Sequence, residues 1–394
     1  MIPVRNPLLK AIKSECKNHN TIPYGRQWID EKDIQTVGDV LRSDWLTTGP
    51  KVAAFEQAFA DYVGAKYAVA VSSGTAALHT AMFAVGIGPG DEVIVPPITF
   101  VATANAVVFQ GGTPIFADVQ EDTLLVNPRM VAEKITERTK AVIGVDYGGQ
   151  PCDWDSLRQL ADDHNIFLVA DACHALGAQY KGRKVGTLAD MTVFSFHPVK
   201  HITTGEGGMI TTDDPALAAR MRRFRNHGID ADHTRREEQG TWYYEMKDLG
   251  YNYRITDFQC ALGLSQLKKL PMFLERRRHI ARTYDQKFAS FKGIKRLSVA
   301  PDVTHSYHLY VIRVEDRDRL FSVLREQGIG VNVHYVPIHL QPYYQKKFGT
   351  EKGLCPVAEY AYQKILTLPI FPGMKDVDIE KVVDELTLQM EVFS

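Results

Sequence analysis

The chain has 394 residues, 45% hydrophobic and 24% charged, which is typical of a folded globular protein. Its formal net charge of −1 gives no strong field of one sign, so neither nucleic acid nor an anionic membrane is expected as a partner. No run of about 18 apolar residues indicates a membrane span, and the N-terminus lacks the apolar stretch of a signal peptide, so we expect a cytoplasmic protein.

Short β-branched runs alternate with turns and helical segments through the first two-thirds of the chain. Strands are predicted over residues 66–71, 91–97, 113–119, 140–147, 166–172, 191–196 and 207–212, with helices over 74–86 and 154–165. This alternation predicts a mostly parallel sheet covered by helices on both faces. Because ligands of such sheets bind beyond the carboxyl ends of the strands, the residues that follow each strand are the candidates for a site.

A second, smaller domain is expected towards the C-terminus. A long helical pattern over residues 256–289, interrupted at Pro271, is expected to lead into it. Further strand and helix signals lie at residues 308–314, 318–328, 331–337 and 378–390. We therefore divide the chain into a large domain, residues 1–265, and a small C-terminal domain, residues 266–394.

Small and hydroxyl-bearing residues follow the first predicted strand, where Ser73, Gly74 and Thr75 precede an alanine-rich helix. Such a turn leaves N–H groups of the first helical turn free to bind an anion, and a phosphate is the obvious candidate. A hydroxyl that only caps the helix would explain the same residues equally well.

A carboxylate and a lysine follow two other strands. Asp171 ends the apolar run "IFLVAD", and Lys200 comes shortly after "MTVFSF". A carboxylate at such a buried edge needs a cation, and a plain ion pair between the two is one possibility. Pyridoxal phosphate is a cofactor that would use all three features, with its phosphate on the Ser73–Thr75 turn, its ring nitrogen on Asp171 and its aldehyde in a Schiff base with Lys200.

Segments along nearly the whole chain resemble the DegT-type sugar aminotransferases, a branch of the type I aspartate aminotransferase fold. The segments that carry the resemblance are "PYGRQWIDEKDI", "SDWLTTGP", "SSGTAALH", "PPITFVATANAV", "DACHALGA", "SFHPVKHITTGEGG", "YNYRITDFQCALGLSQLKKL" and "GVNVHYVPIHLQPYY". The resemblance implies a three-layer α/β/α fold with a mostly parallel central sheet and a smaller C-terminal α+β domain. It also implies pyridoxal 5'-phosphate as the cofactor.

Within the family, the segments around Asp171 and Lys200 most resemble the transaminase of pseudaminic acid biosynthesis. This implies transfer of an amino group from L-glutamate to UDP-2-acetamido-2,6-dideoxy-β-L-arabino-hexos-4-ulose. An enzyme like UDP-4-amino-4-deoxy-L-arabinose synthase is the alternative, and a catalytically silent nucleotide-sugar sensor is the alternative outside enzymes. The family's sugar dehydratases carry histidine in place of the lysine, so Lys200 argues against them, although the adjacent His201 makes the alignment worth checking.

The resemblance implies a role for each matching position around the cofactor. Lys200 would hold the cofactor and move a proton, Asp171 would bind the ring nitrogen, and His174 would contact the ring hydroxyl. Phe100 would stack on the ring, although a plain core position is its other interpretation. The phosphate would be bound by Gly74, Thr75 and Ser195, together with Asn252 of the partner subunit, so a homodimer is implied.

The implied nucleotide-sugar site draws on three further stretches of the chain, which are Tyr24, the segment Asp44, Trp45, Leu46 and Thr47, and the segment Val333, His334, Tyr335 and Val336. Arg254 is a candidate for the carboxylate of the amino donor, or else a surface arginine in a salt bridge. His197 and His201 have helical i, i+4 spacing, but no third ligand accompanies them, so no metal is expected.

Overall fold

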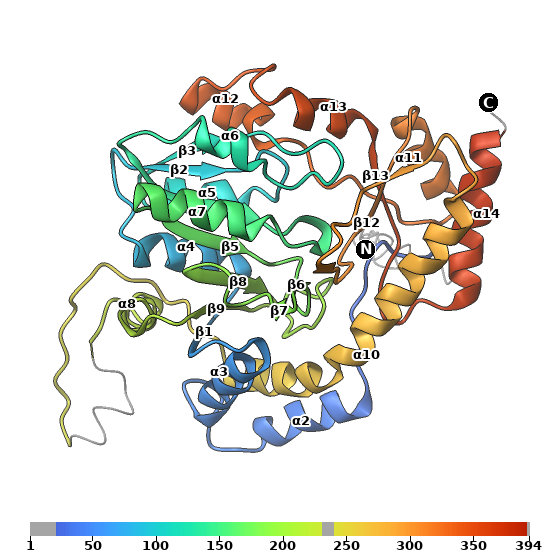
Figure 1. Cartoon of the computed structure of the whole chain (residues 1–394). Helices are drawn as coiled ribbons and strands as arrows, with labels where there is room; N and C mark the ends of the chain where they lie inside the picture. The colour runs from blue at the N-terminus through green and yellow to red at the C-terminus, as the bar shows by residue number, and fades with distance from the viewer. Residues whose placement is uncertain (1–20, 231–239, 392–394) are drawn as a thin grey trace, which may run out of the picture.

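A seven-stranded sheet forms the centre of the larger domain in the computed structural model, which describes residues 21–230 and 240–391 (Figure 1). Its strand order is β1-β9-β8-β5-β4-β2-β3. β9 runs antiparallel to both of its neighbours, and the other strands are parallel to one another. The strands are β1 (Tyr67–Val71), β2 (Glu92–Val95), β3 (Thr113–Phe116), β4 (Thr139–Val145), β5 (Phe167–Asp171), β8 (Met191–Ser195) and β9 (Gly208–Thr212). The mostly parallel sheet predicted from the sequence is therefore confirmed.

Helices cover both faces of this sheet. The connections β1 to β2 and β2 to β3 step in one direction along the sheet, whereas β3 to β4 and β4 to β5 step back. Since crossovers between parallel strands are right-handed, the two sets of helices lie on opposite faces. One set is α4 (Gly74–Ala84) and α5 (Ala102–Phe109), and the other is α6 (Pro128–Ala132) and α7 (Trp154–His164). This gives the predicted three layers.

The long helix α10 (Asp257–Phe288) connects the two parts of the molecule (Figure 1). It contacts α2 (Glu31–Leu41) and α3 (Pro50–Val63) near its start and α14 (Asp376–Glu391) further on. The predicted interruption at Pro271 is wrong, because the helix continues through this residue. Leu270, Phe273 and Leu274 are buried on either side of it, so core packing holds the helix together despite the missing proline N–H.

The proposed domain boundary between residues 265 and 266 falls inside α10. Leu267, Leu270 and Leu274 belong to the apolar core of the large sheet, and Ile280 and Tyr284 belong to a second core under the small sheet.

No helix within the described ranges is both long and apolar enough to cross a membrane. The first 20 residues, on which the expected cytoplasmic location partly rests, lie outside the described part of the chain.

The small domain contains an antiparallel sheet with the strand order β10 (Lys295–Arg296), β12 (Tyr310–Arg313) and β13 (Ile365–Leu368), and the helices packed beside it. The predicted element over residues 331–337 is not a regular strand or helix, since it makes a single bridge between Asn332 and Thr367 before turning back towards the large sheet. The remaining elements are β6 (Gln179–Tyr180), β7 (Arg183–Lys184), α8 (Pro215–Arg225), β11 (Val303–Thr304), α11 (Arg317–Glu326), α12 (Pro342–Phe348), α13 (Pro356–Lys364) and the 3₁₀ turns η1 (Tyr147–Gly149) and η2 (Ile338–Leu340).

Candidate active site

A cavity of about 600 Å³, called the active-site cavity below, lies at the carboxyl edge of the large sheet. Residues that follow β1, β2, β5 and β8 line one side of it, and residues 332–335 with His308 line the other. The predicted site residues that it brings together are Tyr24, Ser73, Gly74, Thr75, Phe100, Asp171, His174, Ser195, Lys200, Val333, His334 and Tyr335. Segments far apart in the sequence therefore meet where the strand ends predicted a site.

The turn after β1 is held tightly against β8 and β9. Ser73 caps α4, since its Oγ accepts a hydrogen bond from the Ala76 N–H at 3.0 Å. A Cβ atom on Gly74 would lie 2.8 Å from Cβ of Ser195, and one on Gly208 would lie 2.4 Å from the Ser73 carbonyl oxygen. Helix caps leave other N–H groups of the first turn without an intrahelical acceptor, so capping by Ser73 and anion binding at this turn are compatible.

Asp171 is a buried carboxylate held by hydrogen bonds, and the charge of Lys200 acts on it only from beyond ion-pair distance. Its side chain is 5% exposed and accepts hydrogen bonds from the Thr103 hydroxyl at 2.7 Å and the Cys173 N–H at 3.2 Å. Within residues 21–230 and 240–391 it forms no ion pair, so the simple pairing with Lys200 is not made. A buried carboxylate in this state is ready to accept a cationic ligand.

Lys200 points into the cavity from the turn between β8 and β9. Its Nζ lies 3.4 Å from Nε2 of His308. Burial lowers the pKa of Lys200, which increases the fraction of neutral, nucleophilic amine. His201 is buried, does not line the cavity, and has its Nε2 3.2 Å from the Ser306 carbonyl oxygen. Lys200, and not its histidine neighbour, therefore faces the active-site cavity.

Aromatic and imidazole rings border the space between Asp171 and the small domain. His174 Nδ1 accepts a hydrogen bond from the Gly148 N–H at 3.3 Å, and its Nε2 lies 3.1 Å from the Tyr335 hydroxyl. Phe100 is 56% exposed at the cavity, so it is not a core residue, and its ring centroid lies 6.1 Å from that of Tyr335. The cavity can therefore accept a flat ring between polar and aromatic walls.

Two contributors were missed by the sequence analysis. Thr103 supplies the shortest hydrogen bond to Asp171, and His308 contacts Lys200. Thr103 lies in α5, inside the segment "PPITFVATANAV" that carries the resemblance, and His308 lies just before β12 in a segment assigned only to secondary structure. The resemblance could have pointed to Thr103, whereas no sequence spacing links His308 to Lys200.

Several predicted site residues do not line the active-site cavity of this single chain. Asp44, Trp45, Leu46 and Thr47 are exposed beside the start of α10, where the Asp257 N–H bonds the Leu46 carbonyl oxygen at 2.9 Å. Asn252 is exposed, and the Arg254 guanidinium bonds the Asn226 side-chain oxygen at 2.8 Å. Val336 follows the lining segment and is 38% exposed. The roles of these residues stay predictions.

Comparison with known proteins identifies the family. Residues 27–387 match the model of the DegT/DnrJ/EryC1/StrS aminotransferase family. The chain belongs to this family. It is 44% identical over 376 residues to the spore coat polysaccharide biosynthesis protein SpsC of Bacillus subtilis, covering 93% of this chain and 97% of that protein.

Solved structures agree with the family assignment. Helicobacter pylori PseC, an aminotransferase involved in the biosynthesis of pseudoaminic acid, matches with a TM-score of 0.89 and 34% identity, covering 95% of this chain and all of that one. The PLP-form of a putative sugar aminotransferase of Streptococcus pneumoniae matches with a TM-score of 0.88, also at 34% identity, covering 95% of this chain and 100% of that chain. The chain is thus a PLP-dependent sugar aminotransferase of the type I fold. This favours an enzyme over a silent sensor.

The histidines around Lys200 generate a prediction about acid stability. Burial lowers the pKa of His174, His201 and His308 well below the ordinary value, and lowers that of His334 to about 3. Each therefore binds a proton in the unfolded chain at a pH where the folded protein excludes it. Above about pH 6.5 these histidines should make their full contribution to the free energy of unfolding. Below this pH the contribution should fall, by about 1.4 kcal/mol per pH unit for each histidine.

Denaturant unfolding of the cofactor-free protein between about pH 7 and pH 5 measures this slope. His201→Gln should lower the number of protons taken up on unfolding by about one. Burial raises the pKa of Asp146 to about 8, which opposes the histidine slope, so the decisive comparison is between the parent and His201→Gln. A slope unchanged by this substitution would show that His201 is not held neutral by the fold.

Proposed function

We propose that the protein transfers an amino group from L-glutamate to UDP-2-acetamido-2,6-dideoxy-β-L-arabino-hexos-4-ulose, forming UDP-4-amino-4,6-dideoxy-N-acetyl-β-L-altrosamine. The observation that carries the proposed chemistry is the convergence of Lys200, Asp171 and the Ser73–Thr75 turn on one cavity. The choice of sugar is supported by the likeness to Helicobacter pylori PseC. An enzyme like UDP-4-amino-4-deoxy-L-arabinose synthase, or one that aminates another nucleotide sugar, is the alternative.

The residues around the cavity fit pyridoxal phosphate. Gly74 leaves the α4 turn pressed against Ser195, with no side chain between the helix N-terminus and the cavity, as a phosphate requires. The Asp171 carboxylate has room for a protonated ring nitrogen because no cation of the described residues pairs with it. When bound, the cofactor supplies an aldehyde that takes up the amino group and a ring that accepts electrons.

The protein's own side chains then have separate tasks. Asp171 holds the proton on the ring nitrogen, and the hydrogen bonds from Thr103 and Cys173 fix its orientation. Lys200 attaches the cofactor and afterwards carries a proton at Nζ, for which its lowered pKa is suited. Phe100, which is exposed at the cavity, would cover one face of the ring, and His174, held by the hydrogen bond from Gly148, would contact the ring hydroxyl.

The substrate is assigned to the open side of the cavity. Tyr24, Val333, His334 and Tyr335 face it from the N-terminal segment and the small domain. We assign the sugar to these residues, and the nucleotide to the segment 44–47 and Val336. The carboxylate of glutamate is assigned to Arg254. Since Asp44, Arg254 and Asn252 lie outside the cavity of one chain, they can complete a site only in an assembly or after a movement.

We propose a homodimer in which Asn252 binds the phosphate in the partner's site. In the ten residues that precede Asn252 in the sequence, Trp242, Met246 and Leu249 are 84%, 64% and 76% exposed, and such large apolar side chains are suited to contact with a second copy. A cytoplasmic location, expected from the sequence, completes the proposal and is tested by cell fractionation.

The amino transfer is tested with the purified, PLP-loaded protein, glutamate and a panel of UDP-4-keto sugars, with the product followed by mass. The panel contains the proposed hexosulose, its epimer at C5 and the UDP-4-keto pentose. We expect amination of the proposed hexosulose at a kcat/KM at least about tenfold above the others, equivalent to about 1.4 kcal/mol in the transition state. Lys200→Ala should give no turnover. A preference for the pentose would establish the alternative, and no amination of any member would reject the function.

The shared site is tested by mixing two inactive chains, Lys200→Ala and Asn252→Ala. In a mixed dimer one site has both intact residues and the other has both defects. Random assembly of equal amounts makes half of the dimers mixed, so activity should return to about a quarter of that of the parent. If mass spectrometry shows chain exchange and activity stays absent, Asn252 does not act across the interface.

A further inference from the structure

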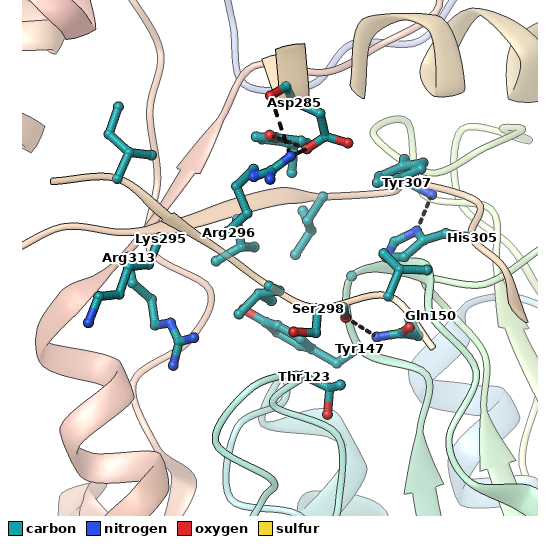
Figure 2. A pocket seen from close by; sticks show the side chains of 17 residues that line it. Thr123, Tyr147, Gln150, Asp285, Lys295, Arg296, Ser298, His305, Tyr307 and Arg313 are labelled. Atoms are coloured by element: carbon teal, nitrogen blue, oxygen red, sulfur yellow. Dashed lines mark hydrogen bonds and ion pairs between the residues drawn. The ribbon is translucent and has the colours of Figure 1, made fainter. Parts of the chain in front are cut away.

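A second cavity, of about 630 Å³, lies between the two domains and is lined by different residues from the active-site cavity (Figure 2). The large domain contributes Thr123 and the η1 turn, and the small domain contributes β10 and β12 with the segment before β12. The rings of Tyr147, Tyr307 and Tyr310 are part of its lining. This volume is within the range of small-molecule sites.

The cavity carries more positive than negative charge. Its acidic residue Asp285 is already satisfied, because it pairs with Arg296 at 2.9 Å and accepts a hydrogen bond from the Tyr310 hydroxyl at 2.8 Å (Figure 2). Lys295 and Arg313 also line the cavity, and neither forms an ion pair within the described ranges. Neither cation therefore has a carboxylate at ion-pair distance in the described chain, and Glu315, which pairs with Lys364, acts on Lys295 only from farther away.

These two cations are forced together by the sheet. Lys295 and Arg313 are directly opposite each other in the antiparallel pair β10–β12, so their side chains leave the sheet on the same side (Figure 2). Like charges in this register destabilise a strand pair. The Arg313 guanidinium donates one hydrogen bond to the Glu121 carbonyl oxygen at 2.8 Å, and its Nε is buried without an acceptor in the described chain. Paired cations without a carboxylate at ion-pair distance, on the wall of a cavity, indicate an anionic ligand.

We propose that the second cavity binds a phosphorylated small molecule of about nucleotide size. The guanidinium of Arg313 and the ammonium of Lys295 bind the phosphoryl oxygens, for which a planar donor and a point charge are both suited. The ring of Tyr307, which is only partly buried, gives a flat group on the ligand a surface to pack against. Binding offsets the repulsion between the two cations.

The second cavity shares a wall with the active-site cavity. The ring of Tyr147 lines the second cavity, and its hydroxyl donates a hydrogen bond to the carbonyl oxygen of His334. The next residue, Gly148, lines the same cavity and donates its N–H to His174. A ligand in the second cavity therefore contacts the segment that positions two residues of the first. The site stands independently of the sugar and amino donor assigned above.

The proposal is tested by calorimetric titration of the PLP-loaded protein with inorganic pyrophosphate. The double variant Lys295→Gln/Arg313→Gln should bind at least about tenfold more weakly than the parent. The control Lys346→Gln/Lys352→Gln removes the same charge from exposed residues that line neither cavity and should bind within about twofold of the parent. Pyrophosphate held in the active-site cavity would bind all three proteins equally, and this result overturns the proposal.

The single variant Lys295→Gln is a control for a folding defect in the double variant. Its side chain is exposed and forms no ion pair in the described chain, so the variant should unfold like the parent and still bind pyrophosphate at least about threefold more weakly. Unchanged binding by this variant, or no binding of pyrophosphate to the parent, contradicts the site.

Discussion

The buried carboxylate of Asp171 is the constraint around which the site is arranged. Burying a charge without a partner costs several kcal/mol, and this one accepts two hydrogen bonds and forms no ion pair in the described chain, with Lys200 acting on it only from farther away. The central position of β5 in the sheet places Asp171 where residues from β1 and β8 can face the same space. A protonated ring nitrogen would supply the missing ion pair, which is why we propose that Asp171 binds the cofactor.

The antiparallel strand β9 gives the site its second fixed point. Residues 196–207 connect β8 to the antiparallel β9. Ser195 lies opposite Gly208, and the Phe196 N–H donates a hydrogen bond to the Gly207 carbonyl oxygen at 2.8 Å. Lys200 lies within this turn and is therefore held at the edge of the sheet. Gly208 also contacts Ser73, so one turn positions both the lysine and the proposed phosphate site.

The features predicted from the sequence are those tied to strand ends. Asp171, Lys200 and the Ser73–Thr75 turn could be found because a parallel sheet brings such ends to one edge. Pro271 was misread because core contacts from Leu270 and Phe273 outweigh its local preference. Thr103 and His308 act through partners distant in sequence, which periodicity does not reveal. The second cavity depends on the register of β10 against β12, which is also a tertiary property.

The most direct test of which lysine carries the cofactor is to reduce the PLP-loaded protein with borohydride and to map the labelled peptide. The placement of Lys200 at 3.4 Å from His308, inside the cavity that holds Asp171, predicts that the pyridoxyl group is found on Lys200. The same treatment of Lys200→Ala should leave the corresponding peptide unlabelled and no other lysine stoichiometrically modified. A pyridoxyl group on another lysine of the parent protein would contradict the central assignment.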